Sequence, residues 1–134
     1  MPPPPGQMVI EALLRRVAVG TGDYPVEAYE FVQRGLVWTV AKIHGKKPEK
    51  DKKPCHVSGQ QLCHGLREFA LYQWGPLART VLRRWNVYGT LDFGRIVFAL
   101  IEHKILNASP TDCLEDFRNV YDFTTLDSYR IRVP

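Results

Sequence analysis

Apolar side chains recur every three or four residues along most of this chain, which is the spacing of one face of an α-helix. Short polar segments, several of them containing Gly or Pro, separate the apolar stretches. Helices are therefore predicted over residues 8–19, 25–44, 58–74, 76–85 and 90–107, with a shorter one after residue 109. The pattern predicts an all-α fold, a compact bundle of five to six short helices.

The clearest local signal lies at the start of the third predicted helix. Ser58 and Gln61 stand three residues apart, as in a capping box, where each side chain bonds a backbone N–H of the other residue. Gly75 suits a left-handed helix end, and Pro76 suits the first turn of a following helix. The stretch from His56 to Trp85 therefore reads as a packed helical hairpin, around which the chain is organised.

Three further expectations concern packing. Gly35 lies in the middle of the second predicted helix, where Gly costs about 1 kcal/mol relative to Ala, and it would let another helix approach closely. Thr90 is expected to cap the fifth helix. The residues expected to be buried close together in the core are Leu82, Trp85, Phe93 and Leu100.

The two ends of the chain leave the helical pattern. We expect residues 1–6 to form a disordered Pro-rich tail, and residues 7–123 to form a single helical domain with a basic loop at 45–55. Residues 124–134 are expected to be a C-terminal tail, either irregular or forming a single edge strand, because Tyr129–Val133 alternates polar and apolar positions.

Composition favours a protein of the reducing cytoplasm. Three cysteines are an odd number and do not describe a disulfide-stapled secreted domain. The first residues lack the basic and apolar regions of a signal peptide, and no apolar segment approaches the roughly 20 residues of a membrane helix. We therefore expect a soluble cytoplasmic chain with no membrane partner.

The positive charge is concentrated in one segment. Residues 42–53 hold six lysines against Glu49 and Asp51, so they carry a net charge of +4, which equals that of the whole chain. Such a loop could contact phosphates, or it could be a solvated loop that maintains solubility. The residues predicted to bind nucleic acid are Lys46, Lys47, Lys52 and Lys53 of the loop, with Arg79, Arg83 and Arg84 of the fourth helix and Arg67 one helix earlier.

Two Cys-His pairs supply four residues of the types that bind zinc. They are Cys55-His56 and Cys63-His64, whose spacing differs from that of common zinc knuckles. Neighbours on a helix point about 100° apart, so one helix residue would bind together with the loop pair and His44 or Cys113. The alternative is a core Cys63 with Cys55 and His64 on the surface, and on that interpretation no cofactor is expected.

Motifs of catalysis are missing from the sequence. It contains no Gly-rich phosphate loop, Ser nucleophile elbow or two-His-plus-acid helix motif. The acidic residues near the C-terminus are typical of a solvated face: Asp112, Glu115, Asp116 and Asp122. We therefore expect a small interaction or adaptor module rather than an enzyme, with an unknown protein partner. The alternatives are a nucleic-acid-binding module and a zinc-stabilised domain.

Several segments resemble a small bacterial family of conserved proteins of unknown function. They are YPVEAYEFVQRGL, HVSGQQL, GPLARTVL, DFGRIVFALIE and VYDF, which run from Tyr24 to Phe123. The resemblance implies no activity. Cys63 and His64 depart from the family's pattern, which argues against a family-wide metal role for them.

A second, local resemblance concerns HVSGQQL and the helix after it. The segment is similar to the second helix of winged-helix regulators, including the ferric-uptake family, and DFGRIVFALIEHKIL would then be the helix that enters the DNA groove. This chain departs by inserting the helix 76–85 between them, and it shows no basic wing. Arg95 is the only basic residue in the first half of that later helix.

Overall fold

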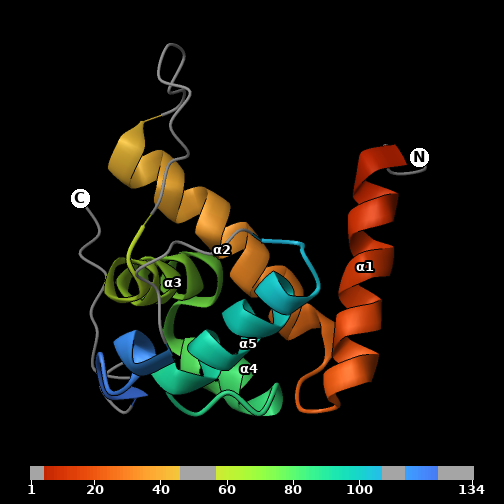
Figure 1. The fold of residues 1–134 in the computed structure, drawn as a ribbon. Coiled ribbons are helices and arrows are strands. Elements are labelled where there is room, and N and C mark those ends of the chain that lie inside the picture. The colour runs from red at the N-terminus through yellow and green to blue at the C-terminus, as the bar shows by residue number, and fades with distance from the viewer. Residues whose placement is uncertain (1–4, 46–56, 107–113, 124–134) are drawn as a thin grey trace.

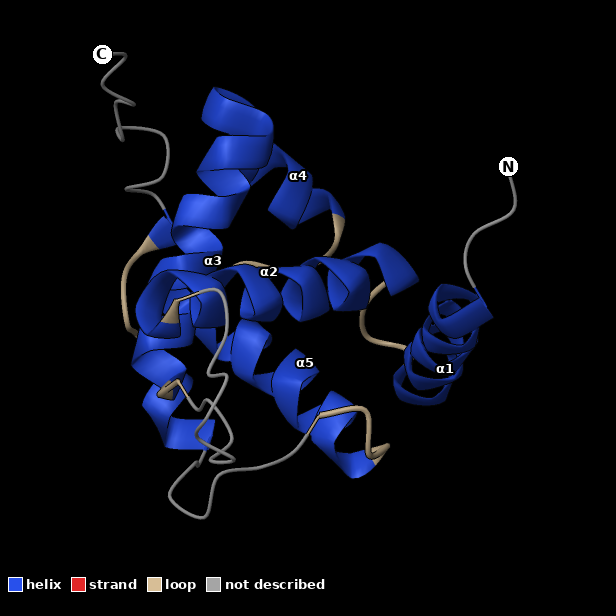
Figure 2. Ribbon diagram, turned by 90° about the horizontal axis from the view of Figure 1, so that it is seen from above, coloured by secondary structure: helices blue, strands red, loops and turns tan. Residues whose placement is uncertain are grey.

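Every regular element that the structure describes is a helix. The computed structural model describes residues 5–45, 57–106 and 114–123 (Figure 1), and Figure 2 shows helices and loops in this part of the chain. The α-helices are α1 (Pro5–Thr21), α2 (Val26–His44), α3 (Gly59–Trp74), α4 (Ala78–Arg84) and α5 (Thr90–Glu102), and the 3-10 helices are η1 (Gly75–Leu77) and η2 (Leu114–Phe117). The predicted all-α class is confirmed. Since no strand occurs among the described residues, the winged-helix topology stays a prediction.

Helix α2 runs through the middle of the molecule and packs on α1, α3 and α5. Helix α1 stands to one side, and only its C-terminal part approaches the other helices (Figures 1 and 2). Accordingly Leu14 and Val17 are buried, whereas Ile10 and Leu13, which share the apolar face, are 39% and 37% exposed. No helix of the described residues is both long and apolar enough to cross a membrane.

Helices α2 and α3 cross at two glycines. A Cβ atom on Gly65 would lie 2.0 Å from the Thr39 Oγ1 atom and 2.8 Å from the Thr39 Cβ atom. A Cβ atom on Gly35 would lie 2.2 Å from the Leu66 Cδ2 atom. The buried Thr39 hydroxyl donates a hydrogen bond to the Gly35 carbonyl at 2.7 Å. The prediction that Gly35 admits another helix is therefore confirmed.

Phe31 of α2 is the centre of an aromatic cluster. Its ring centroid lies 5.4 Å from that of Phe69 and 5.0 Å from that of Trp74, both on α3. It also lies 5.9 Å from Trp85 and 6.3 Å from Phe93, so it joins α2 to α3, α5 and the end of α4.

The residues predicted to form the core are buried with one exception. Leu82, Phe93 and Leu100 are at most 1% exposed. Trp85 is only partly buried, because it follows the last residue of α4 and packs edge-on against Trp74, which is itself partly exposed.

The predicted capping box opens α3. The Ser58 Oγ atom accepts from the Gln61 backbone N–H at 3.0 Å, and the Gln61 Oε1 atom accepts from the Ser58 backbone N–H at 2.8 Å. At the other end of the helix Gly75 has a φ of 54°, in the left-handed region predicted for it. Both ends of α3 are therefore as predicted, whereas the predicted helix 76–85 is divided into the 3-10 helix η1 and the shorter α4.

We expect Ser58→Ala to lower the free energy of unfolding by about 0.5–2 kcal/mol, because the Gln61 backbone N–H would lose its side-chain acceptor. Thermal and denaturant unfolding would measure the loss. Ser58→Asp keeps an acceptor at the cap and should retain most of the stability. An Ala variant as stable as the parent would contradict the assigned role.

Several helix ends differ from the prediction. Helix α1 begins at Pro5, since Pro is tolerated in a first turn, so the predicted tail is wrong for Pro5 and Gly6, and residues 1–4 lie outside the described part. Helix α5 stops at Glu102 rather than near residue 107, because Lys104 has a φ of 59° and the Ile105 N–H turns back to the Leu100 carbonyl.

The start of α5 also differs. Gly89, not Thr90, is the cap residue, and the Asp92 carboxylate accepts from the backbone N–H groups of Tyr88 and Gly89. The Thr90 hydroxyl instead donates to the Phe117 carbonyl and accepts from the Val120 N–H. Thr90 is therefore a tertiary anchor, because its hydroxyl bonds a distant segment rather than its own helix.

The segment after α5 docks through Phe117. In its described residues 114–123, the helix at the place of the predicted sixth helix is the short η2. Cβ atoms on Gly59 and Gly94 would lie 3.0 Å and 2.7 Å from Phe117 side-chain atoms, so both glycines make room for this ring. The anchored segment continues to Asp122 and Phe123, which line a surface hollow beside α4.

Candidate nucleic-acid interface

Helix α4 separates its apolar and basic residues between two faces. Ala78 and Leu82 are one helical turn apart and both are buried. Arg79 and Arg83 are likewise one turn apart on a neighbouring face, where Arg79 is partly buried and Arg83 is exposed. Arg84 follows and is also exposed. The buried face orients the helix so that its three arginines share the outer side.

The three arginines line a surface hollow in two parts. The first part has a volume of about 160 Å³, and its lining is Arg79, Arg83, Tyr88, Asp122 and Phe123. The second has a volume of about 270 Å³, and its lining is Thr80, Arg83, Arg84 and Tyr88. Because Arg83 and Tyr88 line both parts, the two parts are adjacent. We call Arg79, Thr80, Arg83, Arg84 and Tyr88 the arginine–tyrosine surface.

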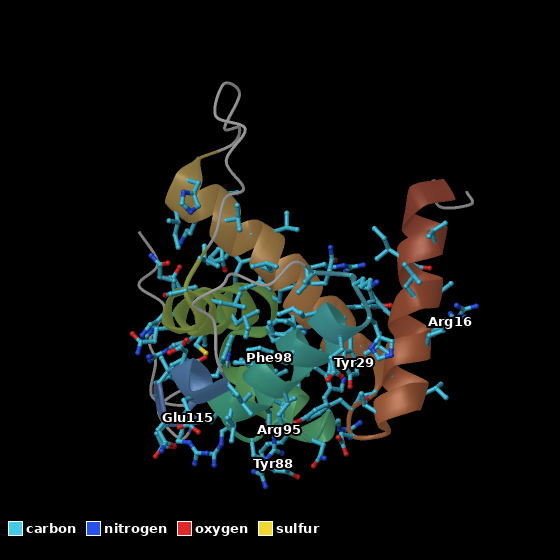
Figure 3. All side chains as sticks on the ribbon, viewed as in Figure 1. Arg16, Tyr29, Tyr88, Arg95, Phe98 and Glu115 are labelled. Atoms are coloured by element: carbon cyan, nitrogen blue, oxygen red, sulfur yellow. The ribbon has the colours of Figure 1, made fainter. Side chains whose placement is uncertain are left out.

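Tyr88 presents an exposed ring from a backbone that is held on both sides. Its side chain is on the outside of the molecule (Figure 3), and the residue is 60% exposed. Its N–H donates to the Asp92 Oδ2 atom at 2.8 Å, and the preceding Val87 is buried, with its N–H bonded to the Leu82 carbonyl. Asn86 turns the chain with a φ of 66° and donates from its side chain to the Asp23 carbonyl. Hydrogen bonds therefore hold the backbone of Tyr88 and of the turn before it.

Asp92 connects this loop to the core. Besides the two backbone bonds, its Oδ1 atom accepts a hydrogen bond from the Tyr24 hydroxyl. Burial, together with this bond to Asp92, raises the pKa of the Tyr24 hydroxyl above its usual value. Tyr24 therefore stays protonated at neutral pH and keeps donating. The carboxylate also lies 3.8 Å from the Arg95 guanidinium.

The structure brings together only part of the predicted nucleic-acid site. Arg79, Arg83 and Arg84 lie side by side, whereas Lys46, Lys47, Lys52 and Lys53 lie outside the described residues. The end of α2 that leads into the basic loop is at the top of Figure 1, and α4 is near the bottom.

Two basic residues outside α4 contact aromatic rings. Lys42, before the loop, pairs with Glu68 at 2.7 Å and lies over the Trp38 ring. Arg67 lies over the ring of Tyr121. The structure therefore gives both a local packing role, and they do not line the hollow beside α4.

The described half of the predicted zinc site points in two directions. Cys63 is fully buried, and burial raises the pKa of its thiol to about 12, whereas zinc binds the thiolate. His64 is exposed, and its ring centroid lies 5.6 Å from that of Tyr121, with the two rings tilted by 35°. Among the described residues no group of three or more potential ligands is placed to hold a metal ion. Cys55, His56 and Cys113 lie outside that part, so a zinc site stays a prediction.

Sequence reasoning missed Tyr88, Asp122 and Phe123. A signal existed for Tyr88, since an aromatic residue inside the turn Asn86–Gly89 has no helical face to join and lies four residues after Arg84. Nothing local indicated Asp122 and Phe123, which approach α4 only because Phe117 docks between α3 and α5.

Comparisons with known proteins found no relative of this chain. No protein-family model, no curated protein and no solved structure shows a significant match to the chain.

Proposed function

We propose that this protein is a small nucleic-acid-binding module that contacts phosphates with the arginines of α4. One observation carries the proposal: three arginines and an exposed tyrosine line two adjacent hollows beside α4. Arginine suits phosphate because its planar guanidinium donates two parallel hydrogen bonds and keeps its charge at any physiological pH. The basic loop at 45–55 would add contacts that depend little on sequence.

A salt-dependent titration tests this proposal. Labelled DNA would be titrated with protein by fluorescence anisotropy at about five salt concentrations, for the parent and for two charge variants. Arg83→Gln/Arg84→Gln removes up to two phosphate contacts, so the logarithmic salt slope on duplex DNA should flatten by up to about 1.8. Changing Lys46, Lys47, Lys52 and Lys53 to Gln should flatten it by up to about 3.6.

The matched control is Arg15→Gln/Arg16→Gln on α1, which removes the same charge as the double variant of α4. Both arginines are exposed, and Figure 3 shows Arg16 on the outer side of α1, far from Tyr88. This control should leave the slope nearly unchanged. If both double variants flattened the salt slope equally, the change would indicate a general effect of net charge. Absence of binding at low salt would overturn the proposal.

A protein partner is the second proposed function, and the composition of the same surface favours it. Tyr and Arg are among the residue types enriched at the energetic centres of protein interfaces. The partner would then be an acidic segment that meets Arg83 and Arg84. A polyglutamate peptide that displaces DNA at equal charge concentration would favour this second function, whereas DNA binding that resists the peptide would favour the first.

A further inference from the structure

The two parts of the hollow differ in chemistry. The part that holds Arg83, Arg84 and Thr80 is purely basic and polar apart from the shared tyrosine. The other part is lined by the exposed Asp122 and the buried Phe123 in addition to its arginines. A carboxylate repels phosphate, but it accepts hydrogen bonds from base edges and has about four acceptor positions, so it can do this while it keeps protein contacts. Phosphate therefore suits one part and a nucleobase suits the other.

The size of the part next to Asp122 agrees with this division. Its volume of about 160 Å³ is close to the roughly 150 Å³ of an engineered protein cavity that takes up benzene. One six-membered ring would therefore fit against the Tyr88 side chain. Arg83 and Tyr88 border both parts, so a phosphate at Arg83 and Arg84 and a base beside Tyr88 would be neighbours on one strand.

We infer that the arginine–tyrosine surface binds single-stranded nucleic acid, with one unpaired base stacked on Tyr88 and its phosphate held by Arg83 and Arg84. This inference rests on the proposed nucleic-acid function. A duplex hides the faces of its bases in the stack, so it offers phosphates and base edges to this surface but no base face to Tyr88. An aromatic ring whose backbone is already fixed loses little freedom on stacking, and the stacked face is common to every base.

The test compares strands with duplexes in one assay. A labelled thymidine strand of about 12 nucleotides and a labelled duplex of the same length are titrated with parent protein and variants at low and moderate salt. Tyr88→Ala should weaken strand binding by about 5- to 150-fold, the range for loss of one stacked base, and leave duplex binding within about twofold. The salt slope should not change, because Tyr88 carries no charge.

Two matched variants separate the contribution of ring stacking from that of the Tyr88 hydroxyl group and from the general effect of removing an exposed ring. Tyr88→Phe keeps the ring and should bind the strand like the parent. Tyr72→Ala removes a more exposed ring from α3, since Tyr72 is 78% exposed and Tyr88 60%, and should also bind normally. Circular dichroism and unfolding curves would show that all three variants fold.

The outcomes separate this inference from the proposed function. Binding of strand and duplex with equal affinity, unaffected by Tyr88→Ala, would overturn single-strand recognition while phosphate binding stands. A Phe variant as weak as the Ala variant would overturn stacking. If neither probe binds at low salt, the proposed function and the inference fall together.

Discussion

Replacing Phe31 with Ala is expected to lower the free energy of unfolding by about 3–5 kcal/mol, the usual cost of truncating a buried aromatic residue. Phe31 is 5% exposed, and its ring contacts rings from α3, α5 and the end of α4. Its loss would remove the common partner of these rings and leave a cavity that several helices would have to close. A domain of this size has only about 5–15 kcal/mol of stability in total.

Denaturant unfolding monitored by far-UV circular dichroism would measure the loss. Tyr72→Ala is the matched control, because it truncates an exposed aromatic ring and should change stability by no more than about 0.5 kcal/mol. Phe31→Leu keeps much of the volume and should lie between the two. A Phe31→Ala loss below about 1 kcal/mol would show that the ring is not the centre of the core.

Adding one methyl group at Gly65 is expected to destabilise the protein by about 1–3 kcal/mol, even though Ala favours a helix by about 1 kcal/mol relative to Gly. The new Cβ atom would meet Thr39 at 2.0 Å and 2.8 Å, distances that real Cβ contacts do not reach. Thr39 cannot swing aside easily, because it is β-branched and its hydroxyl is bonded to the Gly35 carbonyl. Helices α2 and α3 would have to move apart.

The thermal midpoint of Gly65→Ala would be compared with that of Gly20→Ala. Gly20 is also helical, but a Cβ atom there would have its nearest neighbour at 4.0 Å, so that variant should be neutral or more stable. Adding Thr39→Ala to Gly65→Ala removes two of the three close atoms and should recover part of the loss. A Gly65→Ala variant more stable than the parent would contradict the close crossing.

The sequence predicted that the arginines of α4 lie close together, but it did not predict which other residues line the surface around them. Arg79 and Arg83 are one turn apart on a short helix, so helical periodicity alone predicts that they share a face, and Arg84 lies beside them outside the buried face of Ala78 and Leu82. The sequence also grouped them with the basic loop, because charge was the only property they shared. The described geometry groups them with Tyr88 instead, since a turn bonded to Asp92 brings its ring to α4.

The sequence by itself determined the local structure of this protein. The capping box of Ser58 and Gln61, the left-handed Gly75 and the helical class depend on neighbouring residues, whose backbone hydrogen bonds and steric limits act within one or two turns.

The tertiary structure alone decided which residues meet across helices. Phe31 lies at the centre of the aromatic cluster, and Asp122 lies beside α4. Thr90 donates to the Phe117 carbonyl and does not cap its own helix. These pairs are 27 or more residues apart in sequence. Their contacts depend on how the apolar faces of the helices pack together and on the glycines that leave room for a neighbouring side chain. Periodicity shows which face of a helix is apolar, but the partner of that face is chosen by the combined shape of all the helices.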